Sequence, residues 1–175
     1  MFTVKSSLFV LLTLIFALSI GAQEKTINKN QVPAAVLDSF AKAYPKATAK
    51  RYAKEIENGK TYYEIESKEG TISRDLLFEP DGKIAEIEES VPYDSLPSAI
   101  KDTVSAKYGK SAFVSAEKIT HPGKPLTYGL VLKVKSKKRE MEFNPDGTRV
   151  KGGEETMEKG ERDTSQTEQG ENETN

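Results

Sequence analysis

The chain has 175 residues, of which 36% are hydrophobic and 30% charged, and its formal net charge is −1. This length accommodates one ordinary domain or two very small ones. Cysteine and tryptophan are absent, and histidine occurs once. The lack of cysteine excludes disulfide frameworks, thiolate zinc sites, thiol nucleophiles and a lipid-modified N-terminal cysteine.

The N-terminal segment predicts a secretory signal peptide. Lys5 precedes an apolar run over 8–20, which is followed by the small residues Gly21 and Ala22. This order is typical of a cleaved leader. An uncleaved anchor is the alternative, but spanning a bilayer takes about 20 apolar residues, more than the run contains. We therefore expect a signal peptide at 1–22, export to the periplasm or the medium, and no stable membrane insertion after cleavage.

The middle of the chain contains two copies of one pattern. Val-Pro-Ala-Ala-Val at 32–36 recurs 64 residues later as Leu-Pro-Ser-Ala-Ile, and Phe-Glu-Pro-Asp-Gly at 78–82 recurs 65 residues later as Phe-Asn-Pro-Asp-Gly. A nearly fixed displacement indicates a tandem structural repeat. The predicted segments are an N-terminal extension at 23–31, a first repeat at 32–90 and a second repeat at 91–150.

Each repeat is predicted to be one helix followed by a four-stranded antiparallel sheet, which gives an α+β fold. Pro33 and Pro97 suit a first helical turn, because the N–H that proline lacks would be unpaired there. After the helix the apolar period changes to two, as around Ile65, which is typical of half-buried strands. Phe78 and Phe143 should occupy equivalent core positions. Turns containing Gly divide the first repeat into strands expected at 47–57, 60–68, 71–79 and 83–89.

The first repeat has three characteristic segments in a fixed order. It begins with a Pro-led helix that ends in Tyr-Pro-Lys, continues with a Lys-Thr-Tyr-Tyr-Glu-Ile strand and then has the segment Leu-Leu-Phe-Glu-Pro-Asp-Gly-Lys-Ile. This order resembles the PepSY-like family, also described as beta-lactamase-inhibitor-like, and the resemblance covers 32–150. The second copy departs from the pattern at Arg149, where an apolar residue is expected, and at Gly109, where the helix ends without Pro. The resemblance implies an extracytoplasmic tandem α/β module with a binding or inhibitory role, and it supplies no catalytic residues.

The sheet face without a helix is the first candidate for binding. If Tyr63 and Ile65 face the core, alternation directs Tyr62, Glu64 and Glu66 to the opposite face. Tyrosine offers a large contact area at small entropic cost, so Tyr62 suits a binding surface, whereas ordinary cross-strand packing is the alternative. We expect this face to bind an unidentified envelope or secreted protein or peptide.

Charge is distributed unevenly and suggests an alternative function. The net charge is −3 over 32–90, +5 over 91–150 and −5 over 151–175, and the last segment is predicted to be a disordered acidic tail. A basic hairpin could attract a polyanion in a structural envelope protein, or its lysines could simply protect an edge strand from aggregation. Nucleic acid is not expected, because the basic strip lacks interleaved aromatic residues. The basic residues are Lys133, Lys135, Lys137, Lys138 and Arg139.

The sequence predicts no enzyme activity, no cofactor and no metal site. Asp81 and Asp146 each precede a Gly, but a calcium loop needs oxygen ligands at several fixed positions, so type I turns are the better explanation. His121 lies in a Thr-His-Pro-Gly turn, and the sequence has no Gly-x-Ser-x-Gly elbow to display a nucleophile. A hydrolase that uses His121 is the second rival function.

Overall fold

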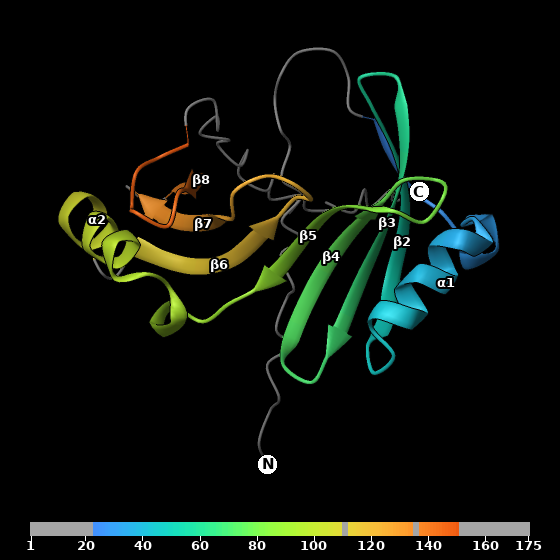
Figure 1. Cartoon of the computed structure of the whole chain (residues 1–175). Coiled ribbons are helices and arrows are strands. Elements are labelled where there is room, and N and C mark those ends of the chain that lie inside the picture. Colours follow the sequence, from blue (N-terminus) through green and yellow to red (C-terminus); the bar gives the residue numbers. More distant parts are fainter. Residues whose placement is uncertain (1–22, 110–111, 135–136, 151–175) are drawn as a thin grey trace, which may run out of the picture.

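The computed structural model describes residues 23–109, 112–134 and 137–150 (Figure 1). The predicted signal peptide at 1–22, the predicted acidic tail at 151–175 and Lys135 lie outside the described residues. Among the helices described, none has the length and apolar character that a membrane crossing requires.

The described chain consists of two halves, each with one α-helix and a run of antiparallel strands. The first half contains β1 (Gln23–Thr26), η1 (Lys29–Gln31), α1 (Ala34–Ala43), β2 (Thr48–Glu57), β3 (Lys60–Glu69), β4 (Ile72–Phe78) and β5 (Ile84–Ser90). The second half contains η2 (Tyr93–Ser95), α2 (Ser98–Tyr108), β6 (Phe113–Thr120), β7 (Thr127–Val134) and β8 (Lys137–Phe143).

The predicted strands of the first repeat agree with β2 to β5 to within two residues. The expectation of four strands in the second repeat is wrong for the described residues, because only the isolated bridge between Phe143 and Arg149 follows β8. Arg149 replaces the apolar residue that Ile84 provides in the first half, so the side chain that packs against the first core has no apolar counterpart at this position. The extension at 23–31 contributes β1, a strand that the sequence did not predict.

All eight strands form one antiparallel sheet in the order β1 to β8. The halves are joined because β5 pairs with β6, with Ile87 opposite Thr120 and Ser90 opposite Glu117. The sheet is strongly twisted, and the two helices lie at opposite ends of it (Figure 1). The chain is therefore an α+β protein with a single continuous sheet.

Both helices pack on the same face of this sheet. Leu76 lies under α1, and alternation along β4 places Arg74 on the same face. Arg74 lies directly across from Glu89 on β5, and Glu89 lies directly across from Lys118 on β6. Because directly opposed residues share a face, Lys118 is on the same face as Leu76. Ala116, two residues before Lys118, belongs to the core under α2. We call this the helix-bearing face, and the opposite face, which carries no helix in the described chain, the helix-free face.

Each helix covers a core of its own. Phe78 and Phe143 are both completely buried, as predicted. Every buried member of the first core has a buried counterpart 64 or 65 residues later in the second, so the two halves pack through matching positions. The first core comprises Val32, Val36, Phe40, Ile65, Leu76 and Phe78, and the second contains Leu96, Ile100, Val104, Leu130, Met141 and Phe143 together with Ala112, Ala116 and Leu132.

The two Pro-Asp-Gly turns pack against the helices in matching ways. Gly82 and Gly147 have φ of +86° and +81°, and a Cβ on either would lie 2.5 Å from the carbonyl oxygen of Ala35 or Ala99. Only glycine therefore lets the backbone approach the helix this closely. The preceding Asp closes each turn, since Asp146 Oδ1 accepts the Thr148 N–H at 2.9 Å and Asp81 forms the matching bond. This geometry agrees with the turn interpretation of both aspartates.

Candidate functional site

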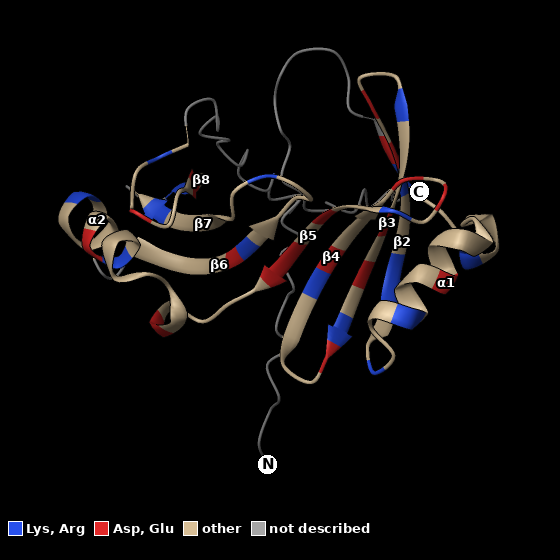
Figure 2. Ribbon diagram, in the orientation of Figure 1, with Lys and Arg blue, Asp and Glu red and all other residues tan. Residues whose placement is uncertain are grey.

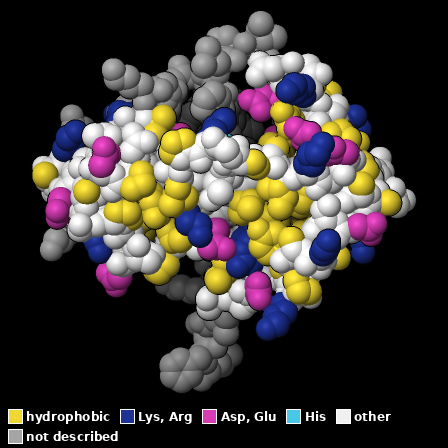
Figure 3. Space-filling view, viewed as in Figure 1, with side chains coloured by type: hydrophobic (Ala, Val, Ile, Leu, Met, Phe, Trp, Pro, Cys, Tyr) yellow, Lys and Arg dark blue, Asp and Glu magenta, His cyan; other side chains and the backbone are white. Residues whose placement is uncertain are grey.

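The helix-bearing face carries opposite charges in alternation where the two halves meet. Arg74 donates to Glu89 at 2.6 Å and to Glu69 at 3.1 Å, and Lys118 lies 3.3 Å from Glu89. The Arg74 guanidinium also stacks 5.1 Å from the centroid of the Tyr44 ring. Figure 3 shows this face with two apolar patches and charged side chains between them. These four charges are thus paired within the chain.

The helix-free face has the opposite pattern over the same strands. Glu66 on β3 lies directly across from Asp75 on β4, which lies directly across from Glu88 on β5. Like charges in directly opposed positions destabilise a sheet. Figure 2 shows both signs of charge along these strands. The strand register places Arg74 and Lys118 on the helix-bearing face and Glu66, Asp75 and Glu88 on the helix-free face. We name the carboxylates gathered here the acidic row: Glu64, Glu66, Asp75, Glu86, Glu88 and Glu117.

Three members of the acidic row, Glu64, Glu88 and Glu117, are buried, which makes their charge costly, and the other three are partly buried. Glu64 is only 6% exposed, and burial, assisted by Glu55 and Asp75, raises its pKa to about 8. Burial and the charge of Glu66 raise the pKa of Asp75 to about 7. Removing a carboxylate from water favours its neutral form, and a neighbouring carboxylate adds to that preference. Glu64 and Asp75 therefore bind protons at pH values where isolated carboxyl groups would have released them.

Glu88 and Glu117 lie toward the β6 end of the row, where β5 meets β6. They are 7% and 8% exposed, and burial raises the pKa of both. Each is also affected by other acids, since Glu117 and Glu86 raise the pKa of Glu88, and Glu140 and Asp75 raise that of Glu117. The charged groups that dominate this environment are all carboxylates.

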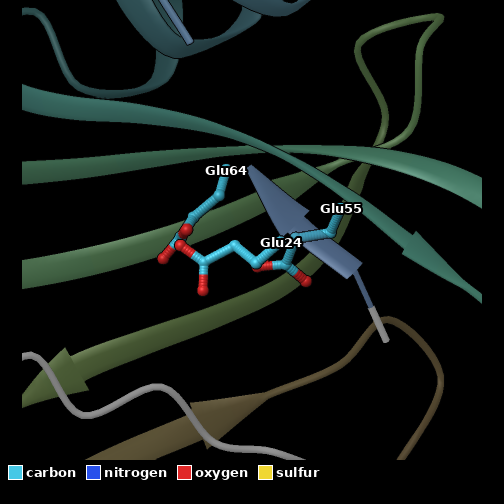
Figure 4. A group of neighbouring side chains, drawn as sticks. All are labelled: Glu24, Glu55 and Glu64. Atoms are coloured by element: carbon cyan, nitrogen blue, oxygen red, sulfur yellow. The ribbon is translucent and has the colours of Figure 1, made fainter. Parts of the chain in front are cut away.

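Arg51 on β2 provides positive charge at one end of the row. Its guanidinium contacts Glu24 and Glu66, and Nη1 lies 3.5 Å from Glu64 Oε2. Glu24, Glu55 and Glu64 come from β1, β2 and β3 and point toward one another, with ligand oxygens within 4.8 Å (Figure 4). Three such oxygens could hold a metal ion, but the Arg51 guanidinium already binds two of the three carboxylates.

Glu117 lies in a gap that Gly129 leaves on β7. The two residues are direct cross-strand partners, and a Cβ on Gly129 would lie 3.2 Å from Glu117 Oε1 and from Ile119 Cδ1. Glu117 Oε1 is buried and accepts no hydrogen bond from any residue that the structure describes. A buried carboxylate oxygen without a donor is costly and unusual in a folded protein.

The sequence-predicted residues of the first repeat lie on the helix-free face. Ile65 is completely buried under α1, so Tyr62, Glu64 and Glu66 project to the other side, as the alternation predicts. Tyr62 is partly buried opposite Glu55. Glu64, expected to face outward, is instead buried among charged neighbours because it contacts Arg51.

The predicted basic residues do not form one surface. Lys133 and Lys138 are cross-strand partners on the helix-free face, whereas Lys137 pairs with Val134 and Arg139 with Leu132 on the helix-bearing face. Lys135 lies outside the described residues. Within the part described, the positive charge of this hairpin is therefore divided between two faces.

His121 lies in the turn between β6 and β7. Its Nδ1 is 3.4 Å from Glu86 Oε2, so it borders the acidic row. The sequence analysis missed most of the row. Alternation around Ile87 could have placed Glu86 and Glu88 on one face. Glu117 was harder to place, because it shares its face with Ile119, which is fully buried, so burial of apolar residues does not indicate which face of β6 is the core.

The comparisons with known proteins agree with this fold. A family model described as "Putative beta-lactamase-inhibitor-like, PepSY-like" matches residues 18–86 and 68–150. No curated protein matches the chain in sequence.

Solved structures from three Bacteroides species are similar to the chain. One, from Bacteroides eggerthii, is described as a "putative periplasmic" protein and has 17% identity and a TM-score of 0.59, covering 68% of this chain and 86% of that one. A DUF2874 family protein from Bacteroides uniformis has 17% identity, a TM-score of 0.57 and coverages of 67% and 86%. A BLIP-like protein from Bacteroides fragilis has 20% identity, a TM-score of 0.55 and coverages of 75% and 91%. At such identities the likeness shows a shared fold, and a fold alone does not determine a function.

Proposed function

Because the chain belongs to the PepSY-like, beta-lactamase-inhibitor-like family, we propose that it is an exported, non-enzymatic binding module. Its ligand is a protein or peptide of the cell envelope or the medium, held on the helix-free face. The mechanism is surface complementarity without a chemical step.

One observation carries this proposal: both helices lie on one face of an eight-stranded sheet. An antiparallel sheet needs only one covered face to build a core, so the other is available for a second role. That other face carries carboxylates in directly opposed positions, which the core does not require. Residues that break the usual rules of sheet stability tend to lie at functional sites.

Export and the tandem repeat are parts of the same proposal. The predicted leader at 1–22 supports export, and a structural relative is described as periplasmic. Matching core positions and matching turns at Gly82 and Gly147 support two copies of one unit, at 32–90 and 91–150. Tandem duplication accounts for the size of the helix-free face, because the sheet continues from one copy into the next.

The structure gives less support to the polyanion-binding alternative. A polyanion needs basic side chains on one surface, and the described basic residues of the β7–β8 hairpin are split between the two faces. The hydrolase alternative depends on His121, whose described ion-pair partner is Glu86.

The test is affinity capture from the envelope fraction of the native organism, with the chain from Gln23 onward as bait. The helix-free-face variant carries Tyr62→Ala and Glu66→Ala. The matched control carries Lys54→Ala and Ile72→Ala, which lie on neighbouring strands on the helix-bearing face. We expect one protein to be captured by the parent and the control but lost with the first variant. Equal loss with both variants, or capture of salt-sensitive polyanion alone, would contradict the proposed function.

A further inference from the structure

The acidic row is best understood by comparing the two faces of the sheet over β3 to β6. On the helix-bearing face of β4, β5 and β6 the register places Arg74, Glu89 and Lys118 in line, so that each charge meets its opposite. On the helix-free face the row Glu66, Asp75 and Glu88 places like charges in line. The strands can therefore carry a balanced pattern, and the helix-free face departs from it.

Glu117 provides an independent indication that something binds here. It is 8% exposed, its Oε1 accepts no hydrogen bond among the described residues, and it occupies the gap over Gly129. A donor brought by a ligand would satisfy this oxygen. The ligand groups that suit a buried carboxylate best are ammonium and guanidinium ions, because their hydrogen bonds to it are charge-assisted.

We infer that the acidic row binds a basic segment of another protein, whose lysine or arginine side chains reach Glu88 and Glu117 on the helix-free face. This inference deepens the proposed function and rests on it. Arg51 shows how recognition works, because its guanidinium lies on the same face and contacts Glu24, Glu64 and Glu66. The incoming cations pair with the carboxylates on β5 and β6 as Arg51 pairs with the carboxylates on β3.

The shape of the row favours a chain over a single metal ion. Calcium takes six to eight converging oxygen ligands, whereas the described carboxylates follow one another across β3, β4, β5 and β6. Strands are spaced by about 4.8 Å, so this series spans about 14 Å, which matches about 13 Å between the first and third of alternate side chains in an extended peptide. The one described group of three converging carboxylates, Glu24, Glu55 and Glu64, already holds Arg51.

A second copy of the chain is a poorer occupant than a different protein. Its densest run of basic residues lies on the β7–β8 hairpin, where Lys133 and Lys138 face one side of the sheet and Lys137 and Arg139 the other. Lys137, Lys138 and Arg139 also have interactions within their own chain. The segment 151–175 has a net charge of −5 and would be repelled by the row.

The experiment measures binding of a synthetic peptide, (Arg-Thr)4, to the chain from Gln23 onward by isothermal titration. The test variant carries Glu88→Gln and Glu117→Gln. The control carries Asp94→Asn and Asp102→Asn, which change the net charge equally at exposed positions in the second half. We expect the parent and the control to bind alike, the test variant to bind about tenfold or more weakly, and (Glu-Thr)4 not to bind. A single Glu117→Gln variant should give an intermediate loss.

Urea unfolding of each variant shows that it is folded, and neutralising the row should not destabilise it. Equal weakening in the test and control variants would overturn the inference, because the attraction would then come from overall charge. Titration with calcium chloride and sedimentation of the chain alone complete the test. Calcium binding without peptide binding would mean that the row holds a metal ion and would overturn the inference. A dimer that dissociates in the Glu88→Gln, Glu117→Gln variant would mean that a second copy occupies the row, and would overturn it as well. If no basic peptide binds while the envelope partner is still lost with the Tyr62→Ala, Glu66→Ala variant, the inference fails and the proposed function stands.

Discussion

Replacing Gly82 or Gly147 by alanine should destabilise the protein more than the same change at other turn glycines. The φ of +86° at Gly82 costs an L-residue about 1–2 kcal/mol. The new Cβ would also lie 2.5 Å from the Ala35 carbonyl oxygen and 2.7 Å from Ser39 Oγ. Because the carbonyl belongs to the α1 backbone, the turn must move away from the helix, and overpacking of this kind costs about 1–3 kcal/mol. The expected total is about 2–5 kcal/mol.

The matched controls are Gly70→Ala and Gly123→Ala. These glycines also have positive φ, but no atom lies within 4 Å of an added Cβ. They should lose only the conformational part, about 1–2 kcal/mol. Urea unfolding followed by circular dichroism measures all four variants. If Gly82→Ala is no less stable than Gly70→Ala, the Pro-Asp-Gly turn does not pack on α1 as described, and the same comparison of Gly147 with Gly123 tests the turn on α2.

Three further predictions concern the cores and the charges. Phe78→Ala and Phe143→Ala should each lower the free energy of unfolding by about 3–5 kcal/mol in chemical denaturation, because both rings are completely buried; parent-like stability in either would mean that the strand phase is wrong. Arg51→Met should cost about 1–3 kcal/mol, because it leaves Glu24, Glu64 and Glu66 without their guanidinium. Lys83→Met removes an exposed ion pair and should leave the urea midpoint nearly unchanged. The free energy of unfolding should fall as pH rises from about 5 to about 8. Burial raises the pKa of Glu64 and Asp75, so the unfolded chain binds fewer protons than the folded chain in this window. A urea midpoint that is constant or rises over this range would contradict the description of the row. Glu89, Asp81 and Asp146 have lowered pKa values, so their contribution is lost only at more acidic pH.

Local patterns in the sequence were sufficient to predict much of the fold. Pro33 and Pro97 precede the helices, Gly-containing turns separate the strands, and alternation around Ile65 gives the correct phase of β3. These features act over a few residues, so they are readable without knowing the rest of the fold. The repeats were expected to lie side by side in one larger sheet, but the register by which β5 pairs with β6 was not predictable in the same way, because no short turn links these strands and α2 lies between them.

The acidic row could not be predicted because its members come together only through long-range pairing. Asp75 lies beside Arg74 in sequence, which suggests a balanced surface, but the two side chains project to opposite faces. Glu117 adjoins Lys118 in the same misleading way. A count of charges along the chain therefore averages two faces that differ in character. The predicted contrast between a negative first repeat and a positive second repeat conceals a sharper contrast between the faces of one sheet.

That contrast relates the stability of the sheet to its proposed role. Four carboxylates of the row lower the stability of the free protein at neutral pH, because burial and neighbouring acids raise their pKa values; they are Glu64, Asp75, Glu88 and Glu117. A cationic ligand would recover that energy on binding, since a group that binds only the folded state stabilises it. The two effects have opposite consequences for a neutralising substitution such as Glu88→Gln, which should stabilise the free protein and weaken its complex. A purely structural role for the row would not produce this opposition, because structural residues stabilise the fold that they belong to.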